Sequence, residues 1–199
     1  KWNSDDVTHS IKLIHEFDNT LSAYISHSTG FKAISTNLGA NATVYAGLPM
    51  DPSIYFANPE EAENFEVGFK KTFSNGYLNM SIFHMAVEGY QSNLFIGTGF
   101  NLVNIGEQTN KGVEIDSLFF LSENFVLTFA ASYIDSTYND FKNGPCDRTF
   151  VPPASDDCPI VNGGPSRVKD FTGRTPSGVP ELAITVSGTY TFDLTENMT

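Results

Sequence analysis

The stretch from Asn104 to Tyr133 alternates between apolar and polar residues, and this alternation restricts the fold more than any other feature. Glu114 and Asp116 separate apolar neighbours, and a polar turn at 122–124 interrupts the pattern once. The odd positions that form the apolar side are Val113, Ile115, Phe119, Leu121, Phe125, Leu127, Phe129, Ala131 and Tyr133. A period of two is that of a β-strand with two unlike faces, not of a helix. Two such strands joined by three polar residues predict an antiparallel hairpin.

The same period of two recurs along the chain and predicts seven strands. The first strand of the central hairpin is expected to start as early as Phe100, with a kink at Gly106. The five strands outside this hairpin are expected at 8–17, 21–31, 62–73, 77–88 and 182–192. Short turns at 18–20, 74–76 and 122–124 alternate with long connections at 33–61, 89–100 and 137–180. All short turns therefore fall at one end of the sheet.

A membrane barrel and a soluble β-sandwich share this alternation but differ in where the apolar face points. Strands of ten or more residues match the roughly 9 to 11 that cross a bilayer at a tilt, and exceed the usual globular length of about 5 to 6. Short turns at one end and long loops at the other are typical of outer-membrane barrels. Phe17, Phe73, Phe125 and Phe192 each lie near a short turn on the apolar face, as an interfacial aromatic girdle requires. The pattern therefore favours the barrel.

The composition of the chain limits the kinds of partner that it can bind. Eleven Lys and Arg against 23 Asp and Glu give a formal net charge of -12, so the chain lacks the basic surface that nucleic-acid binding needs. No apolar run approaches the roughly 20 residues of a membrane helix, so a membrane would be crossed by strands. The first residues are polar and acidic with no signal peptide, and we expect either a cytosolic protein or a piece of a longer one.

The number of strands points to an incomplete barrel. Bacterial single-chain barrels generally have an even number of strands, from 8 upward, and closure removes the exposed sheet edges. We therefore expect an all-β fold, namely an antiparallel up-and-down transmembrane β-barrel segment of about seven strands from a larger barrel. Its short turns would be periplasmic and its long loops extracellular.

Several segments, in order and at matching strand ends, resemble the C-terminal part of the barrel of TonB-dependent outer-membrane receptors. The resembling residues are Tyr24-Ile25-Ser26-His27-Ser28-Thr29-Gly30-Phe31-Lys32, Asn58-Pro59-Glu60, Glu63-Asn64-Phe65-Glu66-Val67-Gly68-Phe69-Lys70, Asn104-Ile105-Gly106-Glu107, Lys111-Gly112-Val113-Glu114 and Pro180-Glu181-Leu182. Each segment is short, but together they extend over nearly the whole chain.

The resemblance implies a plugged barrel of about 22 strands in the outer membrane, in contact with its lipid. Such a receptor binds a scarce nutrient, often a ferric siderophore, at its extracellular loops. The TonB energy-transducing complex acts on it through the plug. Residues 1–199 would then be a partial barrel domain, because the plug with its TonB-contacting segment, the remaining strands and an aromatic C-terminal residue are absent from the sequence.

Two cysteines, Cys146 and Cys158, lie in the longest predicted loop. On an extracellular surface we expect them to form a disulfide, which would stabilise the loop by roughly 3 kcal/mol. Two cysteines without a nearby histidine are too few ligands for a metal site.

Residue patterns for catalysis are missing, and we expect no enzyme activity, no cofactor and no metal. His9, His15, His27 and His84 lack metal-binding spacing and are expected at strand or rim positions, and there is no G-x-S-x-G motif. Glu66, Lys70, Glu114 and Asp116 are expected to face the lumen. The aromatic residues that could contact a ligand in the loops are Tyr45, Tyr55, Phe56, Tyr90 and Phe95, although the sequence does not distinguish among them.

Two alternatives to a TonB-dependent receptor remain open from the sequence. One is an unplugged, porin-like barrel. The other is a soluble, secreted β-sandwich that binds carbohydrate or protein, in which the phenylalanines would pack a core between two sheets.

Overall fold

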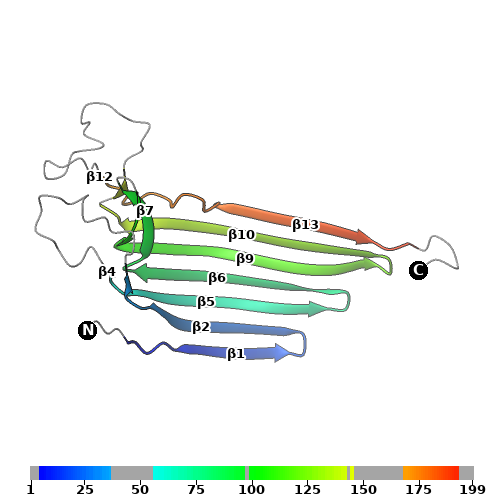
Figure 1. Cartoon of the computed structure of the whole chain (residues 1–199). Coiled ribbons are helices and arrows are strands. Elements are labelled where there is room, and N and C mark those ends of the chain that lie inside the picture. The colour runs from blue at the N-terminus through cyan, green and yellow to red at the C-terminus, as the bar shows by residue number, and fades with distance from the viewer. Residues whose placement is uncertain (1–4, 37–55, 97–98, 143, 146–167, 193–199) are drawn as a thin grey trace, which may run out of the picture.

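Seven long antiparallel strands form one sheet in which each strand pairs with the next long strand along the chain (Figure 1). The computed structural model describes residues 5–36, 56–96, 99–142, 144–145 and 168–192. The strands of the sheet are β1 (Ser10–Asp18), β2 (Leu21–Lys32), β5 (Glu60–Phe73), β6 (Gly76–Glu88), β9 (Glu107–Ser122), β10 (Phe125–Asp140) and β13 (Leu182–Tyr190). The predicted seven-stranded, up-and-down arrangement is confirmed.

Six shorter strands lie at the end of the sheet opposite the short turns (Figure 1). They pair two by two in small sheets of their own. These strands are β3 (Ser35–Thr36) with β4 (Phe56–Ala57), β7 (Gln91–Ile96) with β8 (Gly99–Asn104), and β11 (Gly144–Pro145) with β12 (Val168–Lys169). The sequence did not predict these pairs.

One predicted strand boundary is wrong. The segment that begins near Phe100 is not the kinked start of the long strand, because β8 pairs with β7 and β9 starts a separate run at Glu107. Between them, Ile105 is almost fully buried, with 1% of its surface exposed. The Gly89 amide donates a hydrogen bond to the Gly106 carbonyl at 2.7 Å. These contacts bend the chain away from the sheet.

Local polar contacts close the first short turn. In the first turn, Asp18 Oδ1 accepts hydrogen bonds from the Thr20 amide at 2.6 Å, the Thr20 hydroxyl at 2.6 Å and the Leu21 amide at 2.9 Å. These contacts lower the pKa of Asp18, chiefly through the Thr20 hydroxyl, because they favour the charged carboxylate. The turn therefore fixes the start of β2 and with it the register of the first strand pair.

The register places like residues side by side on each face of the sheet. Residues that pair directly across neighbouring strands lie on the same face. One such row is apolar in every strand and consists of Leu13, Ile25, Val67, Ile82, Val113, Tyr133 and Leu182. The adjacent row on the opposite face contains Ile14, Tyr24, Gly68, Ser81, Glu114, Ser132 and Ala183. We call these two surfaces the apolar face and the polar face.

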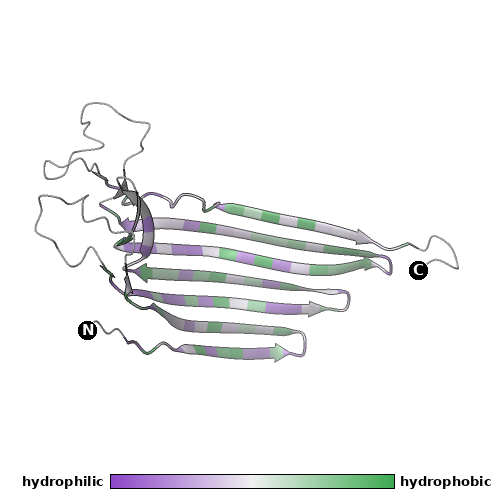
Figure 2. Cartoon of the chain, in the orientation of Figure 1, coloured by the Kyte–Doolittle hydropathy of each residue, from purple (hydrophilic) through white to green (hydrophobic). Residues whose placement is uncertain are grey.

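Neither face is covered by a second layer in the described part of the chain. On the apolar face, Ile25, Val67 and Ile82 are 52%, 53% and 54% exposed. Figure 2 shows apolar and polar residues interspersed along the long strands. A sandwich would bury one of the two faces, so the structure does not support the soluble-sandwich alternative. Within the described ranges, no helix is long and apolar enough to span a membrane.

A small closed core lies at the loop end of the sheet instead. Its members are Ala57, Val87, Ile105 and Phe141, each with no more than 8% of its surface exposed. They come from β4, from the end of β6, from the link between β8 and β9, and from the segment just after β10. The loop bases are therefore packed and hydrogen-bonded, while the long strands are bare on both faces.

Candidate functional site

The polar face carries a cluster in which an aromatic ring links opposite charges. Lys12 Nζ lies 3.6 Å from the centre of the Tyr24 ring, and the Tyr24 hydroxyl donates a hydrogen bond to Glu66. The ring lies over Gly68, where a Cβ atom would come within 2.6 Å of Tyr24 Cζ. Gly68 therefore leaves room for Tyr24 to cross between strands, and the three polar groups are held in one place.

Other polar side chains extend this surface across the sheet. Asn79 Nδ2 donates to the two carboxylate oxygens of Asp116, at 3.3 and 3.1 Å. Toward the loop end, the Ser136 hydroxyl donates to Asn110 Oδ1 at 2.6 Å, and Gln108 Nε2 donates to the same oxygen at 3.0 Å. Ser136 is 1% exposed. Hydrogen bonds therefore hold these polar side chains of the polar face in fixed positions.

The prediction that Glu66, Lys70, Glu114 and Asp116 share one face is confirmed by the register. Lys70 pairs with Asn79, which in turn pairs with Asp116, and Glu114 pairs with Ser81 on the same side. Two open hollows also lie on this face, one beside Glu114 and Asp116 and the other beside Lys70. The polar face can therefore hold water or contact polar groups of another protein body or a solute.

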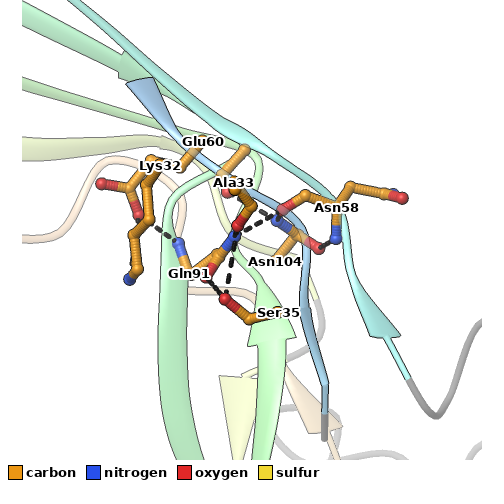
Figure 3. Close-up of polar contacts among 8 residues, drawn as sticks. Lys32, Ala33, Ser35, Asn58, Glu60, Gln91 and Asn104 are labelled. Atoms are coloured by element: carbon orange, nitrogen blue, oxygen red, sulfur yellow. Dashed lines mark hydrogen bonds and ion pairs between the residues drawn. The ribbon is translucent and has the colours of Figure 1, made fainter. Parts of the chain in front are cut away.

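At the loop end, a buried glutamine joins the base of one long connection to the base of the next (Figure 3). Gln91, at the start of β7, is 5% exposed. Its Nε2 donates to the Ala33 carbonyl at 3.0 Å and to the Asn58 carbonyl at 2.7 Å, and its Oε1 accepts from the Ser35 hydroxyl at 2.8 Å. The side-chain amide thus acts as a bridge between separate backbone segments.

Aromatic packing fixes the base of the third connection. The Phe141 ring lies 5.0 Å from the Tyr138 ring and 5.3 Å from the Phe171 ring, centre to centre. The Phe171 amide donates to the Phe141 carbonyl at 2.8 Å. Nearby, the hydroxyl and amide of Thr172 hydrogen-bond to Asp170 and hold the pKa of its carboxyl below the usual range. The returning chain is therefore anchored on the end of β10.

Toward the loop end, the apolar face carries ionisable side chains. His27 Nε2 lies 2.9 Å from Glu63 Oε1, and His27 Nδ1 lies 3.2 Å from His9 Nε2. Lys111 Nζ lies 3.1 Å from Asp135 Oδ2. The rim of the band predicted to contact lipid is thus polar, where the cost of a charge is lowest. In the described part of the chain, no three His, Cys, Asp or Glu side chains form a group that could hold a metal ion.

Several predicted residues lie outside the described ranges. Cys146 and Cys158 are among them, so their disulfide stays a prediction. Of the five loop aromatics, Tyr45, Tyr55 and the side chain of Phe95 also lie outside, whereas Phe56 lies in β4 and Tyr90 precedes β7. The predicted strand or rim positions of the histidines are confirmed, with His15 in β1, His27 in β2, His84 in β6 and His9 just before β1.

The structure also brings together residues for which the sequence predicts no contact. By sequence pattern Gln91 lies in a loop and Asn104 starts the central alternating stretch, and their hydrogen-bond partners are 15 to 58 positions away. The only local signal is that the two residues flank a short alternating run. That signal predicts neither their burial nor their contacts.

Comparisons with known proteins point to one family. The family model described as "TonB dependent receptor-like, beta-barrel" matches residues 1–198. The probable TonB-dependent siderophore receptor PiuA of Acinetobacter baumannii is 25% identical over 193 residues, which are 96% of this chain and 23% of that protein.

Solved structures agree on the fold. The crystal structure of the siderophore receptor PiuA from Acinetobacter baumannii superposes with a TM-score of 0.63 at 21% identity, over 94% of this chain and 24% of that one. The ferric yersiniabactin uptake receptor FyuA from Yersinia pestis gives a TM-score of 0.61 at 14% identity, over 92% of this chain and 23% of that one. The chain therefore spans about a quarter of the length of these relatives.

Proposed function

Because the chain belongs to the TonB-dependent receptor β-barrel family, we propose that it forms one wall of an outer-membrane receptor that takes up a ferric siderophore or a similar scarce nutrient. Its role in that receptor is transport and not catalysis. The inference of a ferric ligand is supported by the similarity of this chain to the siderophore receptor PiuA and by the fold that it shares with the ferric yersiniabactin uptake receptor FyuA.

The observation that carries the proposal is the uncovered apolar face. Leu13, Val67 and Ile184 are 68%, 53% and 57% exposed, and they belong to continuous apolar rows. Full burial of one such side chain is worth about 1.5 to 3 kcal/mol, so leaving many half-uncovered in water is costly. In hydrocarbon the same side chains meet an equally apolar solvent. This difference supports a lipid-facing position in the outer membrane.

The two edges of the sheet support a larger barrel. In the described part of the chain, β1 and β13 each pair with a neighbour on one side only, and all nine residues of each are exposed. Long unpaired edges recruit further strands, and inside a membrane their backbone groups must be paired. We infer that other strands of the same receptor close the barrel, and that residues 1–199 are a partial barrel domain.

The polar face would then line the lumen. Its hydrogen-bonded groups and open hollows suit contact with a plug domain, through which the TonB complex would act on the receptor. The connections at the opposite end from the short turns would be extracellular and would meet the nutrient.

An uptake assay tests the proposal. The complete receptor would be expressed in a Gram-negative strain without its own ferric-siderophore receptors, with and without a functional TonB complex. We expect uptake of radioactive iron(III) bound to a synthetic tris-catecholate or tris-hydroxamate to require both the receptor and TonB. Uptake that continues without TonB would instead indicate an unplugged, porin-like barrel, and no uptake with either strain would contradict the ferric-ligand assignment.

We also propose that Cys146 and Cys158 form a disulfide in the extracellular loop. Their loop would be closed by a short ring, which stabilises it by roughly 3 kcal/mol through the lost entropy of the unfolded loop. Peptide mapping of the receptor from outer membranes under non-reducing conditions should recover the two cysteines linked. Quantitative alkylation of both thiols without a reductant would contradict this proposal.

A further inference from the structure

We propose that Gln91 is a positioning residue that fastens the β7–β8 hairpin to the neighbouring external connection, so that the nutrient meets a preformed outer surface. The expected effect on nutrient binding rests on the proposed uptake function. The attachment of the hairpin by Gln91 depends only on contacts among the described residues. Gln91 does not need to touch the nutrient to act in this way.

The first observation is that the side-chain amide of Gln91 makes three hydrogen bonds although the residue is only 5% exposed. The groups it bonds, which are the Ala33 and Asn58 carbonyls and the Ser35 hydroxyl, all belong to the connection between β2 and β5. Gln91 itself belongs to the connection between β6 and β9. The side chain thus crosses from one external connection to the next (Figure 3). A leucine at this position would keep the volume but remove all three contacts, and the Asn58 carbonyl and the Ser35 hydroxyl would keep only their bonds to Asn104 and Ala33.

The backbone of Gln91 adds a charged contact to the same place. Its amide donates to Glu60 Oε2 at 2.7 Å. The same carboxylate oxygen lies 3.7 Å from Lys32 Nζ, so the charge of Glu60 is itself partly paired. Hydrogen bonds to an ionised acceptor are stronger than neutral ones. The first residue of the hairpin is therefore held at both its side chain and its main chain.

The other leg of the hairpin is tied to the same segment. Asn104 pairs with Gln91 across β7 and β8. Asn104 Oδ1 accepts from the Asn58 amide at 2.6 Å, and its Nδ2 donates to the carbonyls of Asn58 at 2.9 Å and Gly89 at 2.6 Å. Both legs therefore converge on Asn58, and the hairpin cannot pivot without breaking one of these contacts.

The position of the hairpin matters for the whole outer surface. β8 touches β4 from the first external connection, and β7 touches β11 from the third. The hairpin therefore lies between the two other connections at the loop end of the sheet (Figure 1). By contrast, the long strands are held by their own backbone ladders, which do not involve Gln91. Loss of the Gln91 amide should loosen the outer surface and leave the barrel intact.

The test uses the complete receptor in lipid vesicles and in cells. The variants are Gln91→Leu, the milder Ser35→Ala, and the matched control Gln108→Leu. Gln108 is also a buried glutamine, 9% exposed, but its side chain bonds to Asn110 and Ser136 within the long strands. Hydrogen exchange is measured at the Gly89 and Ile105 amides, which donate to Gly106 and Tyr90 at the hairpin base. Uptake is measured with radioactive iron(III) bound to a synthetic tris-catecholate and to a tris-hydroxamate.

For Gln91→Leu we expect exchange at the Gly89 and Ile105 amides to be at least about tenfold faster, because several buried hydrogen bonds are lost together. The half-saturating concentration of the iron complex should rise about tenfold or more with an unchanged maximal rate, since preorganisation affects binding. Ser35→Ala should shift both measurements in the same direction by less. Gln108→Leu should leave the exchange of the Gly89 and Ile105 amides within about twofold of the wild type, because its side chain bonds only within the long strands in the described part of the chain.

Exchange in Gln91→Leu that stays within about twofold of the wild type would overturn the proposal, as would equal effects in Gln108→Leu. A fall in maximal rate alone would also overturn it, because this would indicate a general loss of folded receptor. If Gln91→Leu does not reach the membrane, Ser35→Ala decides, and unchanged exchange there counts against the fastening. If the exchange pattern is as expected but the wild type takes up neither iron complex, the attachment of the hairpin by Gln91 is confirmed and the proposed ferric uptake function is contradicted.

Discussion

Replacing Ile82 by arginine tests whether the apolar face meets lipid. Ile82 is 54% exposed on the apolar face between Val67 and Val113, its partners on the neighbouring strands. It lies six positions beyond Gly76, where β6 begins at a short turn. At about 3.3 Å per residue and a tilt of about 40°, this places Ile82 about 15 Å above the turns, near the middle of an apolar band about 25 Å tall. An arginine at that depth costs about 2 to 4 kcal/mol.

The matched control is Ser81→Arg, one residue earlier in the same strand. Ser81 points to the polar face and pairs with Gly68 and Glu114. An arginine there enters an aqueous surface that already carries carboxylates. We expect it to change the free energy of unfolding by no more than about 1 kcal/mol, as for other exposed charges.

The assay is a urea titration of the complete receptor refolded into lipid vesicles, read by tryptophan fluorescence and by the heat-modifiable mobility of the folded barrel. Ile82→Arg should lower the free energy of unfolding by about 2 to 4 kcal/mol and Ser81→Arg by less than half of that. If Ser81→Arg is the more damaging change, the two faces have been assigned the wrong way round. If Ile82→Arg costs less than about 1 kcal/mol, the residue does not lie in the hydrocarbon region.

Two further predictions concern single contacts. Gly68→Val should lower the free energy of unfolding by about 1 to 3 kcal/mol in the same titration, because the added Cβ displaces the Tyr24 ring. Combining it with Tyr24→Ala should recover part of this loss. An unchanged midpoint for Gly68→Val would refute the placement of the Tyr24 ring over Gly68. Nuclear magnetic resonance of labelled aspartate should give a pKa for Asp18 below the ordinary 3.8, and Thr20→Val should raise it. Because the folded pKa is lowered, the stability that Asp18 contributes is present above its unfolded pKa and is lost as the pH falls through the folded value; a folded pKa at or above 3.8 would contradict this.

The faces of the sheet could be predicted from the sequence because they depend on local periodicity. In β5, alternate residues already distinguish Phe65 and Val67 from Glu66 and Gly68, and the register agrees with that division. A slip of one residue would reverse every side chain, so the two unlike faces also specify the pairing.

Where the alternation is blurred, only the pairing assigns a face. The sequence gives no face for His84 or Met85. In the structure His84 pairs with Phe65 on the apolar face, and Met85 pairs with Asn64 on the polar face. An apolar residue on the polar face and an ionisable one on the apolar face hide the pattern at the loop end of β6.

The loop end could not be predicted because its contacts join residues far apart in the chain. Gln91 bonds with Ala33, 58 positions earlier, and nothing in the sequence around Gln91 indicates burial. The break between β8 and β9 is also set by distant partners, since Ile105 is buried and its amide donates to Tyr90. The local pattern there continues as if the strand were unbroken, which explains the wrong boundary near Phe100.

The most direct measurement is a spin-label scan of residues 112–119 in β9 of the complete receptor in lipid vesicles, comparing collision rates with oxygen and with a water-soluble nickel complex. Labels at Val113, Ile115 and Phe119 should collide preferentially with oxygen, which concentrates in hydrocarbon. Labels at Glu114 and Asp116 should collide preferentially with the nickel complex. An alternation of the opposite phase, or access of the nickel complex to every position, would contradict the assignment of the apolar face to lipid.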